Sequence, residues 1–219
     1  METMRIRQII DFTIMQMRQV GSCGIRMDDI AKGLNMSKRT IYMEFPSKEY
    51  LARRCLENLA RRGRGILYNG LHLNTLKIPV LDVYITVFAY VAAINKASRI
   101  LLVEIRSKCL YKELAEQEKI FWMTHLTHAL EKSKGCFALS ISIPVEQLSY
   151  DILSFFYSNC VNGNSYVSQF QIVALLLRGL FKNIEVENVE YEISRINEYF
   201  LMKLEKPAFD RYKADSCNI

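Results

Sequence analysis

The chain contains little of what interrupts helices, with four prolines and nine glycines in 219 residues. Because these residues mark turns and strand ends, their scarcity favours long helices over a many-stranded sheet. Apolar residues also recur in steps of three and four, which is typical of amphipathic helices. An all-α fold is expected, with the later helices at residues 80–95, 111–131, 145–161, 170–181 and 189–204. The stretch at 136–143 has a strand-like composition but is short and isolated, so it is interpreted as a loop or helix edge.

Motifs of catalysis are also missing. The sequence has no glycine-rich phosphate loop, no G-x-S-x-G and no H-E-x-x-H, so an enzyme is not expected. It has six cysteines, but no C-x-x-C pair or other metal-like spacing. We therefore expect reduced thiols, no metal and no cofactor, with a redox-sensing role as an alternative for any exposed pair. The cysteines are Cys23, Cys55, Cys109, Cys136, Cys160 and Cys217.

Long hydrophobic runs are absent as well. No run of 18 or more apolar residues predicts a membrane span. The first residues, METMRIRQIIDF, alternate charged and apolar side chains in a helical pattern, unlike a secretory signal. The sequence thus predicts a cytoplasmic protein with no membrane partner.

The positive charge is concentrated at one end of the chain. Residues 1–64 contain 13 basic and 7 acidic side chains, whereas the remaining residues contain 16 of each. The whole net charge of +6 therefore belongs to the first part. A basic region beside a neutral one is a typical footprint of nucleic-acid binding.

The basic region contains a pattern for two short helices joined by a tight turn, between residues 24 and 51. Asp28 and Asp29 favour a helix start, because acidic groups are stabilised near exposed helix N–H groups. Asn35 suits the turn, since asparagine enters the left-handed conformation at low cost. Ser37 then predicts the cap of a helix over 38–44, which Pro46 would end. Ser47 predicts the cap of a third helix that has Glu49 in its first turn.

At 100° per residue, the 38–44 helix separates into two faces. Ile41 and Phe45 share the face to be buried, and Arg39 and Met43 point away from it. Arginine can bond guanine in the major groove, and a methionine can rest on a thymine methyl group. We expect Lys38, Thr40 and Tyr42 to hold phosphate oxygens, with Lys48 doing so at the next helix start.

This part of the chain resembles the TetR/AcrR transcriptional regulators. The resemblance covers residues 9–56, and its motifs are Gly21, DDIA at 28–31, LNMSKRTIY at 34–42 and FPSKE at 45–49. It implies a helix-turn-helix DNA-binding domain at 1–50, a helical effector-binding and dimerisation domain at 51–206, and a tail at 207–219. It also implies a homodimeric repressor that leaves a palindromic operator in double-stranded DNA when a small-molecule effector binds. With the face assignment, the expected DNA contacts are Arg26, Lys38, Arg39, Thr40, Tyr42, Met43 and Lys48.

Two residues leave an alternative open. Arg26 stands where the family usually has a Thr or Ser cap, and it cannot accept helix N–H bonds. Glu44 would repel phosphate unless it faces solvent, forms a salt bridge or accepts from a cytosine amine. The alternative is a helical dimeric module that binds a ligand or protein without sequence-specific DNA binding.

The larger part offers weaker signals. Helices between residues 145 and 204 are the candidate dimer interface, as a four-helix bundle. Aromatic side chains could line an apolar ligand cavity, although such residues on amphipathic helices more often belong to the ordinary core. His125 and His128 lie three apart, but no third ligand stands at a convincing spacing, so a packing or partly exposed role is favoured over a metal. The ligand-binding candidates are Tyr84, Phe88, Phe121, Trp122 and His125.

Overall fold

The computed structural model describes residues 3–97, 99–108, 111–136, 143–162, 171–173, 175, 179–181 and 186–205. The regular elements of these residues are helices, which confirms the all-α fold. The α-helices are α1 (Met4–Gly24), α2 (Met27–Gly33), α3 (Lys38–Glu44), α4 (Lys48–Leu71), α5 (Pro79–Ala97), α6 (Arg99–Ser107), α7 (Lys112–Lys132), α8 (Val145–Val161) and α10 (Val186–Glu205). A short 3-10 helix, Lys134–Cys136, follows α7.

Local signals predicted most of these bounds well. Helices α3 and α8 have the expected limits, and α5, α7 and α10 differ by a few residues. Helix α6 was missed, and the helix that begins after Ser47 continues through the expected domain boundary to Leu71. The 170–181 helix is only partly described, while Cys109, Cys217, residues 137–142 and the tail at 207–219 lie outside the described residues.

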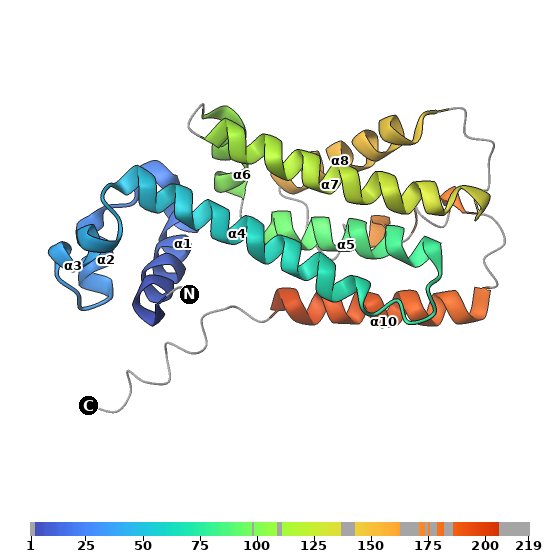
Figure 1. Ribbon diagram of the computed structural model, residues 1–219, viewed down its shortest axis with the longest axis horizontal. Helices are drawn as coiled ribbons and strands as arrows, with labels where there is room; N and C mark the ends of the chain where they lie inside the picture. Colours follow the sequence, from blue (N-terminus) through green and yellow to red (C-terminus); the bar gives the residue numbers. More distant parts are fainter. Residues whose placement is uncertain are drawn as a thin grey trace.

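Two hydrophobic clusters organise the molecule. The first joins α1–α3 and the start of α4, and it also includes Leu101 of α6, Leu114 of α7 and Tyr111, which directly precedes α7. The second surrounds α5 with the rest of α4 and helices α7, α8 and α10. We call the assembly of α1–α3 with the start of α4 the reading unit, and the rest the larger domain. Figure 1 shows the reading unit at one end, with α4 running from it along the larger domain.

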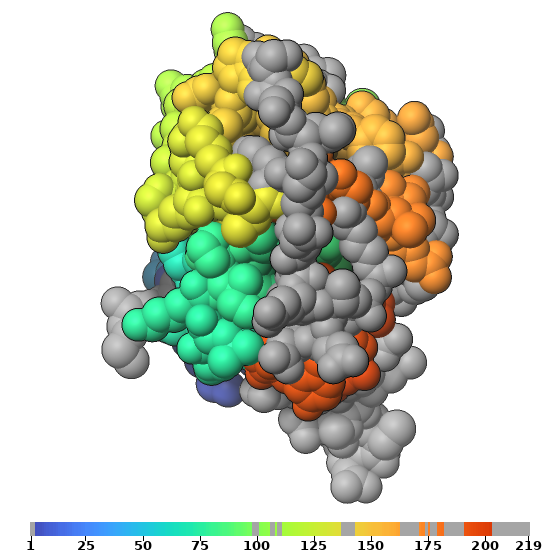
Figure 2. All heavy atoms as spheres, turned by 90° about the vertical axis from the view of Figure 1, so that its right-hand side faces the viewer, coloured from blue at the N-terminus to red at the C-terminus, as the bar shows by residue number. Residues whose placement is uncertain are grey.

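Helix α5 is the central element of the larger domain. Most of its side chains are fully buried, including Tyr84 and Phe88. Among the described residues it is the one helix long and apolar enough to span a membrane, but its apolar stretch is covered by its neighbours. Figure 2 looks at the end opposite the reading unit, where the start of α5 lies between the end of α7 and α10. Helix α5 is thus a core helix.

Candidate nucleic-acid interface and ligand cavity

The turn between α2 and α3 has the geometry that its residues predict. Asn35 lies in the left-handed region at φ 50°. The Ser37 side chain accepts a hydrogen bond of 3.1 Å from the Thr40 N–H and so caps α3. Phe45 is extended at the end of α3, immediately before Pro46. The Ser47 hydroxyl likewise caps α4 by accepting from the Tyr50 N–H at 3.1 Å.

Helix α2 begins without a side-chain cap. Arg26 stands at the cap position with extended backbone, and its side chain forms no capping hydrogen bond. The Arg26 carbonyl still accepts from the N–H groups of Asp29 and Ile30 at 3.1 and 3.2 Å. The exposed Arg26 side chain is therefore left at the positive end of α2.

The two faces of α3 are those expected from the helical period. Ile41 and Phe45 are buried in the core of the reading unit. Met43 is 76% exposed, Tyr42 is 47% exposed and Arg39 is exposed. An arginine and an apolar side chain thus project together from a helix at the end of the molecule, where a DNA groove can reach them (Figure 1).

Three of the side chains expected to hold phosphate already have a polar partner within the protein. The Lys38 ammonium pairs with Asp28, and the Lys48 ammonium donates to the Cys23 carbonyl at 2.8 Å. The Thr40 hydroxyl lies 2.8 Å from the Ser37 hydroxyl. By contrast, Arg26 and Arg39 have no side-chain polar partner within the part of the chain that the structure describes. These two arginines can meet a DNA anion without giving up an existing bond.

Glu44 forms a salt bridge, one of the alternatives expected for it. Its carboxylate lies 3.3 Å from the Arg5 guanidinium, and its side chain is 23% exposed. The pair joins the end of α3 to the start of α1 and offsets the negative charge that Glu44 would otherwise present to DNA.

The larger domain contains a cavity of about 360 Å³ next to the reading unit. Five helices line it, from residues 56–63 of α4 to residues 150–157 of α8, with α5, α6 and α7 between. Its wall is mainly apolar, with small side chains such as Ala60 and Ala93 beside the aromatic rings of Tyr90 and Trp122.

The cavity overlaps little with the ligand-binding set expected from the sequence, which stays a prediction. Of the five candidates, only Trp122 lines it. Tyr84 and Phe88 are fully buried in the core around α5. Phe121 and His125 instead lie against each other, with ring centroids 4.2 Å apart and ring planes tilted by 41°.

Of the two histidines, His125 packs against aromatic rings, whereas His128 does not in the part of the chain that is described. Tyr68 lies edge-on to both Phe121 and His125, and the His125 Nδ1 lies 2.8 Å from the Phe121 carbonyl oxygen. His128 is exposed. Within the described ranges, no three His, Cys, Asp or Glu side chains gather as a metal site.

Periodicity could not select the cavity residues, because α5 is buried around most of its circumference and its stripe does not reveal which face meets a void. The residues that sequence reasoning missed include Tyr90, Tyr150 and Tyr157. Small residues, which allow helices to approach closely, indicate the position of the cavity wall better than the helical period does. A Cβ added at Gly63 would lie 2.8 Å from the Ala93 Cβ, and both residues line the cavity.

Three helices, α4, α6 and α7, contribute side chains both to the hydrophobic cluster of the reading unit and to the cavity wall, and on α7 the same residue, Leu114, does both. On α4, Leu56 is part of the reading-unit core and also lines the cavity. On α6, Leu101 is buried in the reading-unit core, while Leu102 and Ile105 line the cavity. The cavity wall is therefore contiguous with the hydrophobic core of the reading unit.

A polar cluster fastens α6 to the end of α1. Gly21 has φ 72° and ψ 174°, a conformation nearly restricted to glycine. This bend breaks the helical geometry of α1, and the next N–H, that of Ser22, donates to the Glu104 carboxylate at 2.7 Å. Lys108 donates to Glu104, to the Ser22 hydroxyl and to the Cys23 sulfur at 2.9–3.0 Å. Burial raises the pKa of Glu104, but these hydrogen bonds and the Lys108 charge outweigh it, so that the pKa lies below its usual range.

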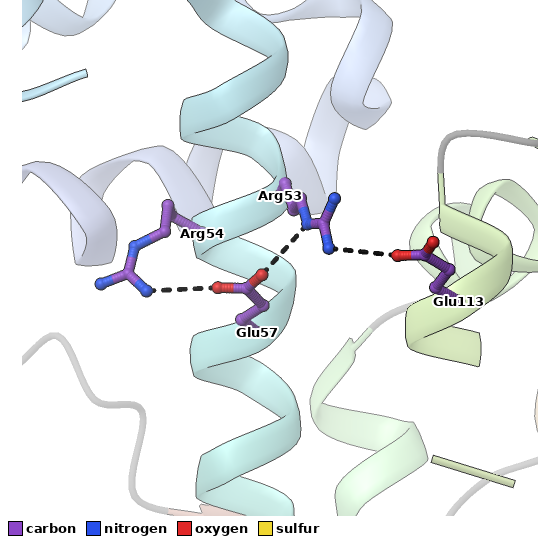
Figure 3. A network of polar contacts seen from close by, with 4 residues as sticks. All are labelled: Arg53, Arg54, Glu57 and Glu113. Carbon is purple, nitrogen blue, oxygen red and sulfur yellow. Dashed lines mark hydrogen bonds and ion pairs between the residues drawn. The ribbon is translucent and has the colours of Figure 1, made fainter. Parts of the chain in front are cut away.

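A second, more exposed connection joins α4 to α7. Arg53 bonds Glu57 at 3.2 Å and reaches Glu113 at 3.4 Å, while Arg54 bonds the other Glu57 oxygen at 3.2 Å (Figure 3). The Glu113 side chain is 80% exposed. Exposed ion pairs contribute little, so the α1–α6 cluster is the stronger polar link.

The described cysteines differ in their exposure to solvent. Cys55 is fully buried, donates to the Ile10 carbonyl at 3.7 Å, and has a thiol pKa that burial raises. Cys160 is also buried and Cys136 is half-buried, whereas Cys23 is exposed. Among the described residues, these four cysteines form no disulfide bond with one another.

Comparison with known proteins places the reading unit in a well-defined group. Residues 9–55 match the family model described as bacterial regulatory proteins of the tetR family. No curated protein sequence matches the chain.

Solved structures resemble the chain over most of its length. A putative transcriptional regulator from Saccharomonospora viridis in complex with choline has a TM-score of 0.71 at 15% identity, covering 83% of this chain and 100% of its own. The ketosteroid transcriptional regulator KstR2 of Mycobacterium tuberculosis has a TM-score of 0.63 at 15% identity, covering 84% and 98%. AibR in complex with isovaleryl coenzyme A and operator DNA has a TM-score of 0.57 at 14% identity, covering 81% and 98%. At these identities the likeness establishes the shared fold.

Proposed function

Because the chain is a DNA-binding transcriptional regulator of the TetR family, we propose that it is a homodimeric repressor that a small-molecule effector releases from a palindromic operator. The observation that carries this proposal is that α4 and α6 contribute side chains both to the hydrophobic core of the reading unit and to the cavity wall. The cavity is the proposed effector site, and α3 is the proposed recognition helix.

In the proposed complex, α3 enters the major groove. Arg39 bonds a guanine edge and Met43 rests on a thymine methyl group, because these are the fully outward side chains of α3. Tyr42, Thr40, Lys38, Lys48 and Arg26 hold phosphate oxygens and fix the register. Lys38 must exchange its Asp28 partner for phosphate, whereas Lys48 has further N–H groups to donate while it keeps the Cys23 carbonyl.

The proposed dimer uses α8 and α10 of the larger domain. Phe155 on α8 is 44% exposed, and Tyr191 and Met202 on α10 are 69% and 56% exposed. Large apolar side chains on outer helix faces support a partner surface. A two-fold dimer would present its two α3 helices to half-sites about 34 Å apart, which is why the operator is expected to be palindromic.

Effector release is proposed to work by a population shift. A ligand in the cavity favours whichever arrangement of α4 and α6 leaves it most room, and that arrangement changes the spacing of the two recognition helices. The ligand can shift the equilibrium only by its difference in affinity between the two arrangements. The choline and isovaleryl coenzyme A complexes of the similar regulators support a ligand role for the larger domain. A regulator of this kind needs no catalytic activity, and it would act beside DNA in the cytoplasm.

Selection of bound sequences from randomised duplex DNA tests the proposal. We expect a palindromic site whose half-sites lie one helical turn apart, bound by a dimer in sedimentation measurements. Salt-sensitive binding without any preferred sequence would contradict the recognition role of α3 and support the ligand- or protein-binding alternative.

A further inference from the structure

The charged groups at the cavity wall already have partners. Glu118 accepts from the Arg64 Nε at 2.9 Å, and the same guanidinium lies over the Phe121 ring at 4.8 Å. Lys119 and Glu116 form an ion pair of 3.6 Å, with side chains 55% and 59% exposed. All three charged lining residues of the described cavity lie on α7, at its rim. None offers an unpaired charge to a ligand inside.

Two polar groups of the wall remain unused. The Tyr157 hydroxyl donates to the Leu102 carbonyl at 2.8 Å. In contrast, the hydroxyl groups of Tyr150 and Ser154 have no hydrogen-bond partner within the described ranges of the chain. These residues are four apart on α8 and therefore share one helical face, and both line the cavity together with Trp122 and Met123 of α7, with Tyr150 at its more open side at 45% exposure.

We infer that the cavity binds an uncharged, mainly apolar molecule with one hydroxyl, carbonyl or similar group placed at Tyr150 and Ser154. This inference rests on the proposed effector site and names the chemical class of its ligand. A buried carboxylate would meet two glutamates and only one cation, Lys119, which is exposed and already paired. A buried ammonium would lack an unpaired carboxylate, because Glu118 is held by Arg64. An unpaired buried charge is costly, whereas a neutral polar group needs only the available hydroxyl groups.

Trp122 allows a direct measurement, since it is the only tryptophan of the chain and lines the cavity. The matched probes are N-phenyl-1-naphthylamine, which is uncharged, and 1-anilinonaphthalene-8-sulfonate, which adds a sulfonate to the same ring system. We expect the uncharged probe to bind with one-to-one stoichiometry and to quench Trp122 by energy transfer, and the sulfonate to bind at least tenfold more weakly. Decan-1-ol should displace the probe at least tenfold better than decanoate or decyltrimethylammonium. Equal or tighter binding of a charged probe or competitor would overturn the inference.

Matched variants of α8 locate the binding. Ser154→Phe should fill the cavity and abolish probe binding, while Ser158→Phe, one turn further along and outside the cavity wall, should leave it unchanged. Tyr150→Phe combined with Ser154→Ala should weaken displacement by decan-1-ol about fivefold and leave circular dichroism unchanged. Loss of probe binding in Ser158→Phe, or an unchanged response to decan-1-ol in the double variant, would contradict the assigned contacts.

Measurements with and without DNA separate this inference from the proposed function. Binding of the uncharged probe without any effect on operator affinity would support the ligand class and contradict effector release. Operator release by a charged compound that binds the cavity more tightly would support effector release and overturn the ligand class.

Discussion

The reading unit and the larger domain differ in how far apart in sequence their functional residues lie. The reading face of α3 is built within seven residues, and its caps and turn lie directly beside it. The cavity draws its wall from five helices between residues 56 and 157. The first part also carries the whole net charge, whereas the second is neutral and mainly apolar inside. The comparison teaches that DNA recognition here is locally encoded, while ligand recognition depends on tertiary packing.

The largest expected effect tests whether the two parts have separate cores. Phe45 is buried in the reading unit, and Phe88 is buried in the larger domain. Each change to alanine should cost about 3–5 kcal/mol in its own core. In urea, Phe45→Ala should cause an early partial loss of helical circular dichroism while the Trp122 fluorescence transition stays in place. Phe88→Ala should move the Trp122 transition itself. An equal shift of that transition in both variants would mean a single cooperative unit.

The next largest effect concerns the bend at Gly21, near the end of α1. Gly21→Ala places a side chain in a conformation that L-residues rarely adopt and disturbs the Ser22–Glu104 bond, so we expect a loss of about 2–4 kcal/mol. Gly65→Ala on α4 is the matched control, because a Cβ there meets open space. It should stabilise the chain by about 0.4–1 kcal/mol. Thermal unfolding of both variants gives the comparison, and a stabilised Gly21→Ala would refute the role of the bend.

Features that depend on neighbouring residues could be predicted from the sequence, whereas contacts between distant residues could not. Ser37, Asn35 and Pro46 act on neighbouring backbone groups, so the limits of α3 and its outward face could be predicted from one short stretch. Glu44 was expected to face solvent or to be salt-bridged, but no local pattern could name Arg5 as its partner. The bonds of Lys48 to Cys23 and of Ser22 to Glu104 likewise join residues 25 and 82 positions apart.

Several patterns in the sequence are compatible with more than one structure. Helix α6 contains a nearly continuous apolar run, and such a run does not distinguish a short helix from a strand or loop. Tyr84 and Phe88 were chosen for their aromatic rings, yet α5 is buried on most sides and both rings face the core rather than the cavity. Only the packing of five helices determines where a void remains.

A further prediction separates base reading from charge within the reading unit. Arg39→Ala should cost about 1–3 kcal/mol at one base position and relax the preference there. Lys48→Ala should weaken all sequences by a similar factor and flatten the salt dependence, because phosphate contacts carry no base information. Arg61→Ala removes the same charge from an exposed site on α4, far along the helix from α3, and should change binding least. Titration of the selected site and its single-base variants at two salt concentrations checks this order, and equal effects of all three variants would contradict it.

The smallest expected effects compare the two polar links between the parts. Glu104→Gln removes a half-buried carboxylate that Ser22 and Lys108 bond, and we expect a loss of about 1 kcal/mol at pH 7. Glu113→Gln removes an exposed one and should cost less than about 0.5 kcal/mol.

The pH dependence of the Glu104 contribution identifies its cause. The native pKa of Glu104 lies below its usual range, so the carboxylate stabilises the fold at pH values above the unfolded pKa of about 4.3. This stabilisation is lost as the pH falls from there through the native pKa. Urea unfolding at pH 7 and at successively lower pH should therefore show the difference between the native chain and Glu104→Gln shrinking below about pH 4. A difference that persists unchanged into acid would mean that Glu104 acts through its shape and neutral hydrogen bonds, and the charged link between α1 and α6 would then be no stronger than the exposed pair at Glu113.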